Sequence, residues 1–198
     1  MARQPSDTPK PRGRPRDNAI DDRVTQATLT LLAAHGYSAL TLDAVAKEAG
    51  VTRPTLYRRW SGKAALVVAA LGAAAPPLVA SSTSDALADL RETAVDFIVR
   101  LGESGYAGTI FAVHAEARHD PELAALVFGT YLLPRAILID DIISRARKQG
   151  TIRADLSNGM VRDLVFGPLV YNWLVVGEVP GRDGVGSLAD AALRAVRV

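Results

Sequence analysis

The chain has 198 residues, a hydrophobic content of 48% and a formal net charge of +2, which together indicate one large or two small domains with a sizeable core. It has no cysteine, which excludes disulfides, zinc–thiolate sites and a thiol nucleophile. The charge is uneven, because residues 1–63 hold 11 Lys/Arg against 6 Asp/Glu, whereas residues 64–198 hold 12 against 15. A basic N-terminal part on an acidic, apolar remainder indicates that the N-terminal part meets a polyanion.

Residues 1–16 are rich in Pro and Arg and show no apolar periodicity, so we expect a flexible basic arm. The stretch Lys10–Arg16 reads KPRGRPR and resembles the core of an AT-hook, an extended motif that lies in the minor groove of A·T-rich DNA. Arg12 and Arg14 would then enter a narrow groove with enhanced negative potential. The alternative is a solvated basic tail without groove preference. No apolar segment follows the arm, so no signal peptide is expected. The longest nearly uncharged run, Ala64–Ser84, is broken by Pro76-Pro77, so no membrane partner is expected either, and the absence of cysteine fits a reducing cytoplasm.

A first helix is predicted from about Asn18 to His35, with Asp17 as its cap and Gly36 as its end. One face of this helix is expected to be buried, because apolar residues recur along it at helical spacing. The expected stripe is Ile20, Val24, Ala27, Leu31 and Ala34.

Two short helices joined by a glycine turn are predicted next. The first has apolar residues at three-and-four spacing from Leu42 onward, and the hydroxyl of Thr41 can cap it. Gly50 can end it in the left-handed conformation, which costs glycine no Cβ clash. The second helix is expected to be capped by Thr52, to have Pro54 in its first turn, and to turn basic and aromatic side chains outward. This arrangement is typical of a helix-turn-helix.

Apolar helices without convincing strands are predicted for the remainder, so the fold class is all-α. A nearly uncharged fourth helix begins at Gly62 and ends or kinks at Pro76-Pro77, which makes it the mechanical link between two parts. We call these parts the head, expected at 17–63 as an N-terminal three-helix DNA-binding domain, and the body, expected at 64–198 as a larger helical bundle. Further helices are expected over 85–102, 109–118, 121–148 with a kink at Pro134, 155–176 with a kink at Pro168, and 187–197, with a loop at 181–186.

A series of short motifs marks the head. They are His35-Gly36-Tyr37, Thr41-Leu42, Val45-Ala46, Ala49-Gly50-Val51, Thr55-Leu56-Tyr57 and Lys63. Their order and spacing resemble the TetR family of bacterial transcription regulators over about residues 17–70. The resemblance implies a dimer that binds palindromic operator DNA, in most members as a repressor, and that releases DNA when a small molecule binds in the body. Two departures, Gly62 where Ser is common and Trp60 where Phe is usual, leave the assignment intact.

The N-terminal end of the second short helix is predicted to read DNA, because in a helix-turn-helix that end enters the major groove. Arg53 can bond bidentately to guanine, and Pro54 and Thr55 can contact thymine. The alternative for Arg53 is a phosphate contact without base reading. The resemblance adds Tyr57 and Lys63 as phosphate contacts, with packing as the alternative for Tyr57. The predicted DNA-binding residues are Arg12, Arg14, Thr41, Arg53, Pro54, Thr55, Tyr57, Arg58, Arg59 and Lys63.

The body is expected to keep a largely apolar pocket for a small-molecule effector, since helical bundles often place ligand sites between their helices. The predicted lining is Phe97, Tyr106, Phe111, His114, Phe128, Tyr131, Asn172 and Trp173. The alternative for each is ordinary core packing, because aromatic stripes are usually core and a lone His is usually a hydrogen-bonded packing residue.

The last two long helices are predicted to pair across a two-fold axis as a four-helix dimer interface. The predicted interface residues are Ile139, Ile142, Ile143, Leu164 and Leu169. The alternative is that all of them face the core of their own protomer.

No catalytic, metal or cofactor site is predicted, and we expect the protein not to be an enzyme. The pattern His114-x-Glu116-x-x-His119 departs from a zinc-binding helix, because its histidines are five residues apart rather than four. The sequence therefore predicts a ligand-responsive, homodimeric transcription regulator. The alternative is a ligand-independent DNA-binding or architectural protein whose body only dimerises. A tightly packed body would favour that alternative, and an enclosed pocket would favour the regulator.

Overall fold

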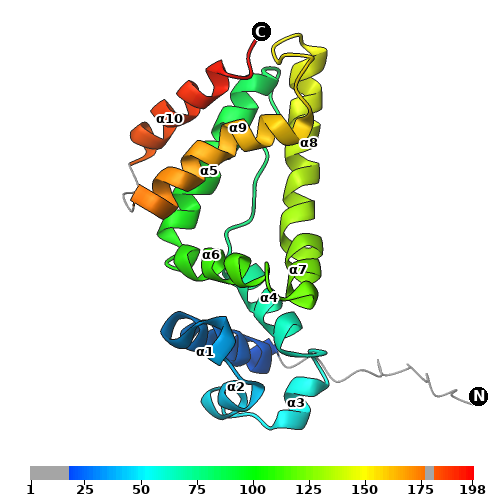
Figure 1. Ribbon diagram of the computed structural model, residues 1–198, viewed down its shortest axis with the longest axis vertical. Helices are drawn as coiled ribbons and strands as arrows, with labels where there is room; N and C mark the ends of the chain where they lie inside the picture. Colours follow the sequence, from blue (N-terminus) through cyan, green and yellow to red (C-terminus); the bar gives the residue numbers. More distant parts are fainter. Residues whose placement is uncertain (1–17, 177–180) are drawn as a thin grey trace, which may run out of the picture.

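The computed structural model describes residues 18–176 and 181–198, and these ranges form an all-α molecule with a head and a body, as predicted (Figure 1). The head, at the lower end of Figure 1, consists of α1 (Asn18–Ala39), α2 (Leu42–Glu48) and α3 (Arg53–Tyr57). The body consists of α4 (Lys63–Ala74), α5 (Ala86–Glu103), α6 (Ala107–Glu116), α7 (Pro121–Val127), η1 (Phe128–Leu132), α8 (Leu133–Lys148), α9 (Asn158–Tyr171), η2 (Asn172–Val176) and α10 (Arg182–Arg194), where η1 and η2 are short π-helical segments. A single β-bridge joins Ile152 to Arg197, beside the C-terminus.

Helix α1 breaks at Gly36, where its end was predicted. Gly36 has φ 76° and ψ 174°, outside the helical region, and the chain makes one further turn beyond it. The buried stripe differs from the expected one, because Ala34 is exposed whereas Leu32 is buried beside Val24 and Ala27. Helices α2, α4 and α6 all pack on α1, so these neighbours rather than a single sequence stripe set its buried face.

The turn between α2 and α3 depends on one glycine. Gly50 has φ 63°, the left-handed conformation that side-chain-bearing residues rarely adopt. The Thr41 hydroxyl caps α2 as predicted, because it accepts a hydrogen bond from the backbone N–H of Ala44 at 3.2 Å. Thr52 occupies the N-cap position of α3, as predicted, but its side chain makes no capping hydrogen bond to the backbone, and its hydroxyl hydrogen-bonds with that of Thr55 at 2.9 Å instead. The two helices therefore meet as a helix-turn-helix whose turn requires glycine.

Two clusters of buried apolar side chains hold the molecule together. The first joins the head to α4, α6 and α7, and the second joins α5, α8, α9 and α10. Leu66 and Val67 of α4 are at most 1% exposed, so α4 lies inside the first cluster, between head and body. Because this cluster contains residues from both sides of residue 63, side-chain packing does not define a domain boundary there. The domain limits of 17–63 and 64–198 therefore stay a prediction.

The helix predicted over 121–148 is continuous but deformed just before Pro134. The chain passes from α7 into η1, and the backbone N–H of Leu133 donates to the carbonyl of Phe128, five residues back. Proline has no backbone N–H and its ring clashes with the preceding turn, so the ordinary α-helical hydrogen-bond pattern is disfavoured next to it. The proline thus accounts for the place of the π-helical segment.

The loop predicted at 181–186 is wrong, because α10 begins at Arg182. One of its glycines, Gly186, serves helix packing instead. A Cβ on Gly186 would meet the Arg91 Nη2 atom at 2.8 Å, so glycine makes room for this guanidinium. Arg91 reaches over it to Asp190 on the next turn of α10, with hydrogen bonds of 2.5 Å from Nε and 3.0 Å from Nη2. The close approach of α5 and α10 therefore explains a glycine that the sequence alone assigned to a turn.

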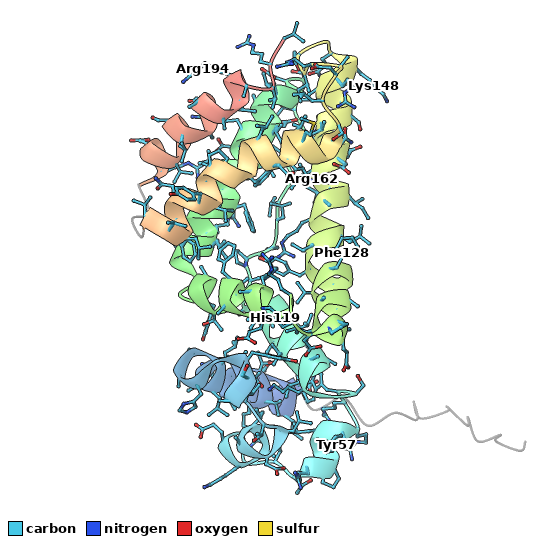
Figure 2. The ribbon with its side chains drawn as sticks, in the orientation of Figure 1. Tyr57, His119, Phe128, Lys148, Arg162 and Arg194 are labelled. Atoms are coloured by element: carbon cyan, nitrogen blue, oxygen red, sulfur yellow. The ribbon has the colours of Figure 1, made fainter. Side chains whose placement is uncertain are left out.

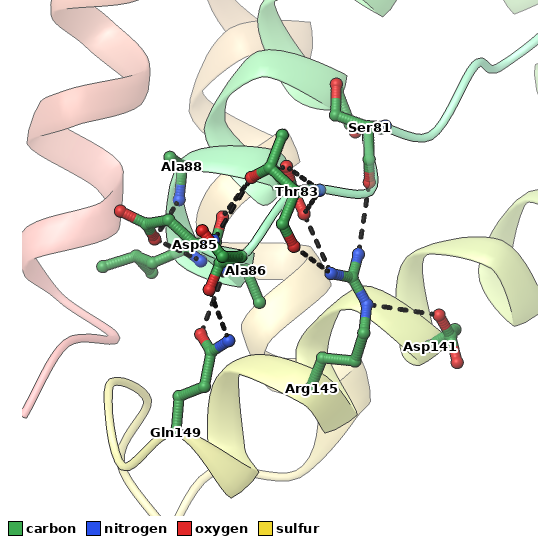
Figure 3. Close-up of polar contacts among 12 residues, drawn as sticks. Ser81, Thr83, Asp85, Ala86, Ala88, Asp141, Arg145 and Gln149 are labelled. Atoms are coloured by element: carbon green, nitrogen blue, oxygen red, sulfur yellow. Dashed lines mark hydrogen bonds and ion pairs between the residues drawn. The ribbon is translucent and has the colours of Figure 1, made fainter.

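A buried ion pair fixes the linker between α4 and α5 to α8 (Figure 3). Asp89 of α5 is 1% exposed and accepts hydrogen bonds from Arg145 of α8 at 2.9 Å and from the Thr83 hydroxyl at 2.8 Å. Arg145 also donates to the Ser81 carbonyl at 3.2 Å. Burial by itself would raise the pKa of Asp89, but the hydrogen bonds from Arg145 and Thr83 outweigh burial and hold that pKa below its ordinary value.

Candidate nucleic-acid interface and ligand cavity

Helix α3 lies at the lower end of the head, away from the body (Figure 1). Its first residues, Arg53 and Pro54, are exposed, and Thr55 is partly exposed. Tyr57 keeps 57% of its surface exposed although it is aromatic (Figure 2). Leu56, between Thr55 and Tyr57, is 1% exposed and anchors the helix to the core. Helix α3 therefore presents the residues predicted to contact DNA on an open surface.

Arg53 forms an ion pair with Asp43 of α2. Both side chains are more than half exposed, at 60% and 53%, so water and ligands reach the pair. A guanine edge or a phosphate would have to compete with this carboxylate for the guanidinium. Asp43 is not among the predicted site residues, although an acidic residue in the first turn of α2, exposed on a basic head, is a signal for such a role.

Of three other predicted DNA contacts, two side chains are exposed to solvent and one is mostly buried in the head. Thr41 and Arg58 are exposed, in positions open to a phosphate. Arg59 is a correction, because it forms an ion pair with Asp21 of α1 at 2.5 Å and only 18% of its side chain is exposed. We therefore assign Arg59 to holding α3 against α1 rather than to DNA. Arg12 and Arg14 of the predicted AT-hook-like arm lie outside the described residues.

Polar contacts join the head to the body around the end of α1. The Tyr37 hydroxyl donates to Asp120 at 2.9 Å, and the Ser38 hydroxyl donates to Glu116 at 3.1 Å. The Lys63 ammonium lies 4.3 Å from the centroid of the Tyr37 ring and donates to the Ser38 carbonyl at 3.3 Å. Burial lowers the pKa of Lys63, and burial followed by the Asp120 carboxylate raises the pKa of Tyr37. A phosphate contact by Lys63 requires it to leave this junction.

A cavity of about 540 Å³, partly open to solvent, lies between the helices of the body, and its size is in the range of small-molecule sites. Its walls come from α5, α6, η1, α8 and α9, with Leu78 contributed by the linker after α4. The predicted residues that line it are Phe97, Phe111, His114, Phe128 and Tyr131. The lining is apolar and aromatic with few polar groups, which is the composition expected of a site for an apolar ligand.

Three predicted pocket residues lie elsewhere. The Tyr106 hydroxyl accepts a hydrogen bond from Gln26 of α1 at 3.4 Å, so Tyr106 belongs to the contact between head and body. Trp173 packs on Phe111 with ring centroids 5.4 Å apart, outside the cavity lining. Asn172 has a buried side-chain oxygen with no hydrogen-bond partner among the described residues, and it does not line the cavity either. Tyr106 and Trp173 thus serve contacts between helices, which sequence spacing does not reveal.

His114 and Arg135 are polar groups of the cavity wall. Nδ1 of His114 lies 2.7 Å from the Ile110 carbonyl and therefore donates to it, which leaves Nε2 as the acceptor of a neutral ring. Burial lowers the pKa of His114, and the nearby charge of Arg135 lowers it further. Arg135 is not among the predicted pocket residues, although its place as the one charged residue between Glu122 and Asp140 is a signal in the sequence. Within residues 18–176 and 181–198, no cluster of His, Asp and Glu is placed to hold a metal ion.

The predicted dimer interface needs correction. Ile139, Ile142, Ile143 and Leu169 are at most 6% exposed within a single protomer, because they fill the second core cluster. They cannot contact a second copy, and only Leu164 of the predicted set is substantially exposed, at 37%. The alternative that these residues face their own core therefore holds for the four buried ones.

Two exposed apolar stripes lie beside these buried residues. Their largest members are Phe128, Leu132, Leu133 and Ile137 on η1 and α8, and Met160, Leu164, Tyr171, Leu174, Val175 and Val176 on α9 and η2. The continuous helical stretch Pro121–Lys148 is apolar enough to cross a membrane by length and composition, and its most apolar 18-residue window is 22% buried. One such helix is weak evidence for a membrane span, since the same composition occurs in helices that pack against protein.

Comparisons with known proteins agree with this geometry. Residues 24–70 match the family model described as bacterial regulatory proteins, tetR family, and residues 80–192 match the model described as Tetracyclin repressor-like, C-terminal domain. The HTH-type transcriptional regulator Rv1556 of Mycobacterium tuberculosis (strain H37Rv) is 33% identical over 174 residues, which is 82% of this chain and 80% of the relative.

A second relative is the DNA-binding transcriptional repressor TetR of Mycobacteroides abscessus, 28% identical over 83% of this chain and 87% of its own. Among solved structures, the TetR family transcription regulator SCO0332 superposes with a TM-score of 0.63 at 26% identity, covering 89% of this chain and 98% of the other. Because the two matched models together span both the helix-turn-helix head and most of the helical body, the chain belongs to the TetR family of DNA-binding transcription regulators.

Proposed function

We propose that this regulator is a homodimeric, cytoplasmic repressor that leaves a palindromic operator when a small, largely apolar effector fills the cavity of the body. The observation that carries the proposal is the place of α6. This helix lines the cavity through Ile110, Phe111 and His114, and it hydrogen-bonds to the head through Glu116 and Ser38. A ligand that moves α6 therefore acts directly on the head.

The N-terminal half of α3 is the proposed reading surface. Arg53 binds a guanine edge, while Pro54 and Thr55 contact thymine, since these three residues open the helix and are accessible. Tyr57 and Arg58, with Thr41 at the start of α2, bind phosphates. Two heads related by a two-fold axis then occupy half-sites about 34–36 Å apart along one face of B-DNA, or a multiple of that spacing.

The exposed apolar stripes support the proposed dimer. A second copy related by a two-fold axis presents the same stripes, so α8 and α9 of one protomer face α8 and α9 of its partner. Met160, Leu164 and Tyr171 are four and seven residues apart, which places them on one face of α9, as a helix–helix contact requires, and Leu174 follows in η2. Burying these side chains against a partner removes apolar surface from water, which is the main favourable contribution to association.

Release follows from linkage between the two sites. An effector shifts the equilibrium only by binding the released conformation more tightly than the DNA-bound one. Operator DNA must then weaken effector binding by the same factor. The contacts of Tyr37 with Asp120 and of Ser38 with Glu116 are the proposed route, because they join the head to α7 and α6.

The alternative of a ligand-independent architectural protein requires a body packed without free space. A cavity of about 540 Å³ favours the ligand-responsive regulator over that alternative. The relative from Mycobacteroides abscessus that is named a transcriptional repressor favours repression over activation.

Selection of bound sequences from random DNA with the purified full-length protein tests the proposal. We expect palindromic sites with two half-sites separated by whole helical turns. Compounds that bind the protein are then titrated against the complex with the selected site. A phenylalanine in place of Ala136, which lines the cavity, should abolish release without changing DNA affinity, whereas Ala125→Phe on the exposed face of α7 should change neither. Sites without two-fold symmetry, or release that survives Ala136→Phe, would contradict the proposal.

A further inference from the structure

Arg135 is a charged residue in an apolar environment. It stands alone as a charge between Glu122 and Asp140, and it lines the cavity at the start of α8. Its guanidinium lies 3.7 Å from the centroid of the Tyr131 ring and 6.0 Å from that of Phe97. Burial lowers the pKa of Arg135, but an arginine keeps its charge at neutral pH, so the cavity wall carries a positive charge.

The hydrogen bonds of Arg135 leave one edge of the guanidinium poorly satisfied. Nη1 donates to the Tyr131 carbonyl at 2.9 Å, and Nη2 donates to the Pro76 carbonyl at 3.3 Å. Nε is buried and has no hydrogen-bond partner among the described residues. The edge formed by Nε and Nη2 therefore has one empty donor and one long hydrogen bond.

The other charged groups of the cavity do not compensate Arg135. Arg162 also lines it, but is paired with Asp140. Asp163 lines it as well, but is exposed to solvent, which screens its charge. Among the described residues no carboxylate forms an ion pair with Arg135, and His114, which also faces it, carries no negative charge in either protonation state.

Arg135 is partly buried and its Nε atom is fully buried, so the missing partner costs free energy that a bound anion can recover. We propose that the cavity takes an apolar molecule with a single carboxylate, whose hydrocarbon part packs among the aromatic rings and whose carboxylate binds the Nε–Nη2 edge of Arg135. This assignment rests on the proposed function, in which the cavity is the effector site. Arg91 already binds the Asp190 carboxylate in the same way, at 2.5 Å from Nε and 3.0 Å from Nη2.

The same edge connects the ligand to the head. Pro76, whose carbonyl holds Nη2, comes directly after α4, which ends at Ala74 with Ala75 as its cap. Nη2 has two N–H groups, so a carboxylate on the Nε–Nη2 edge shares this nitrogen with the Pro76 carbonyl. Binding at this edge thus pulls on the guanidinium that holds the C-terminal end of α4 to α8. Since α4 packs on α1, a shift of this tether is passed on to the head.

Matched ten-carbon probes test the ligand class on the full-length protein by isothermal titration calorimetry, below their aggregation concentrations. Decanoate is expected to bind about 10–100-fold more tightly than decanol, as for a hydrogen bond to a charged group, and decylamine more weakly than either. Arg135→Met should weaken decanoate by a similar factor and leave decanol unchanged, and Arg135→Lys should fall between. Arg118→Met, an exposed arginine after α6, is the matched control and should bind decanoate like the wild type.

Equal affinity for decanoate and decanol in the wild-type protein overturns the proposal, as does decanoate binding that survives Arg135→Met. The wild-type comparison of the three probes decides the matter even where the Met variant does not fold. Release of the selected operator is measured in parallel. Arg135-dependent decanoate binding without release supports the carboxylate site and contradicts the proposed effector role, whereas release by decanol at decanoate's concentration contradicts only the carboxylate site.

Discussion

The Arg53 side chain is exposed and forms an ion pair with Asp43, which would compete with DNA for the guanidinium. These two facts determine how substitution of Arg53 should change DNA binding. Arg53→Ala is expected to lose about 1–3 kcal/mol of discrimination between the preferred and mismatched base, with a smaller loss of affinity for random DNA. Competition binding of matched and mismatched operators, in at least two salt concentrations, measures both quantities. A uniform loss across all sequences would instead assign Arg53 to a phosphate.

Asp43→Asn is the companion variant, because it removes the carboxylate that holds Arg53 without touching Arg53. Removal of a negative charge beside phosphates should tighten binding to all DNA. If Asp43 also orients the guanidinium toward one base, discrimination falls while total affinity rises. An Asp43→Asn protein with weaker binding to random DNA would show that the carboxylate helps DNA binding rather than competing with it.

His114 gives the folded protein a pH dependence near neutrality. The pKa of His114 in the folded protein is lowered, mainly by burial. An unfolded histidine gains its proton at about pH 6.5. Below that pH the unfolded chain therefore binds more protons than the folded chain. The contribution of neutral His114 to the free energy of unfolding is therefore fully present above that pH and is lost as the pH decreases. Urea unfolding between pH 5 and 7.5 should show a steeper loss for the wild type than for His114→Gln, while His119→Gln, at an exposed site, should follow the wild type. Parallel curves for all three proteins would contradict this assignment.

At the scale of elements, the Asp89–Arg145 pair ties the linker after α4 to α8 and should be costly to break. Arg145→Met leaves the Asp89 carboxylate buried without its counter-ion, and we expect a loss of about 3 kcal/mol, near the lower end for buried pairs because 26% of the Arg145 side chain is exposed. Chemical denaturation measures the loss. Asp141→Asn removes a second carboxylate 3.5 Å from Arg145 that is 76% exposed, and should change stability by less than about 0.5 kcal/mol.

A double variant separates the ion pair from packing. Asp89→Asn with Arg145→Met leaves no unpaired buried charge, so it should recover part of the stability lost by Arg145→Met alone. Equal losses for the single and double variants would place the effect in the packing of the Arg145 side chain instead.

The elements that the sequence predicted best are those specified by neighbouring residues. The cap at Thr41 and the left-handed Gly50 are local devices, and the structure has both. The start of α10 was missed because Gly186 is fixed by Arg91 of α5, far away in the chain. Likewise the apolar residues of α8 and α9 lie on several faces, so their spacing could not distinguish the buried Ile142 from the exposed Ile137. The role of the isolated Arg135 could be inferred only once the structure placed it in the wall of the cavity.

At the scale of the whole molecule, side chains of the head and of the body pack in one core cluster, so the head is not connected to the body by a flexible linker alone. Helix α4 lies inside this cluster, with α1 on one side and α7 on the other. A displacement at the C-terminal end of α4 therefore reaches the head through packed side chains rather than through a flexible linker. Two discrete packings of such a core, rather than gradual bending, are the physical basis of a switch of this kind.

The proposed dimer is the remaining property of the whole molecule, and the exposed stripe on α8 makes it testable. Ile137 is 62% exposed in the protomer, so a glutamate there leaves the protomer's own core undisturbed. Between two copies, however, the same glutamate places a charge in an apolar interface close to its symmetry mate. We expect Ile137→Glu to shift the protein toward monomer in size-exclusion chromatography with light scattering, at micromolar concentrations where we expect the wild type to be dimeric.

Val79→Glu is the matched control, because Val79 is 52% exposed but lies on the linker after α4 rather than on α8 or α9. It should stay dimeric. Loss of the dimer should also weaken operator binding, since two tethered heads gain from the effective concentration that one head provides for the other, whereas affinity for a single half-site should not change. An Ile137→Glu protein that remains dimeric, or a wild type that is monomeric at these concentrations, would place the contact between copies on a different surface.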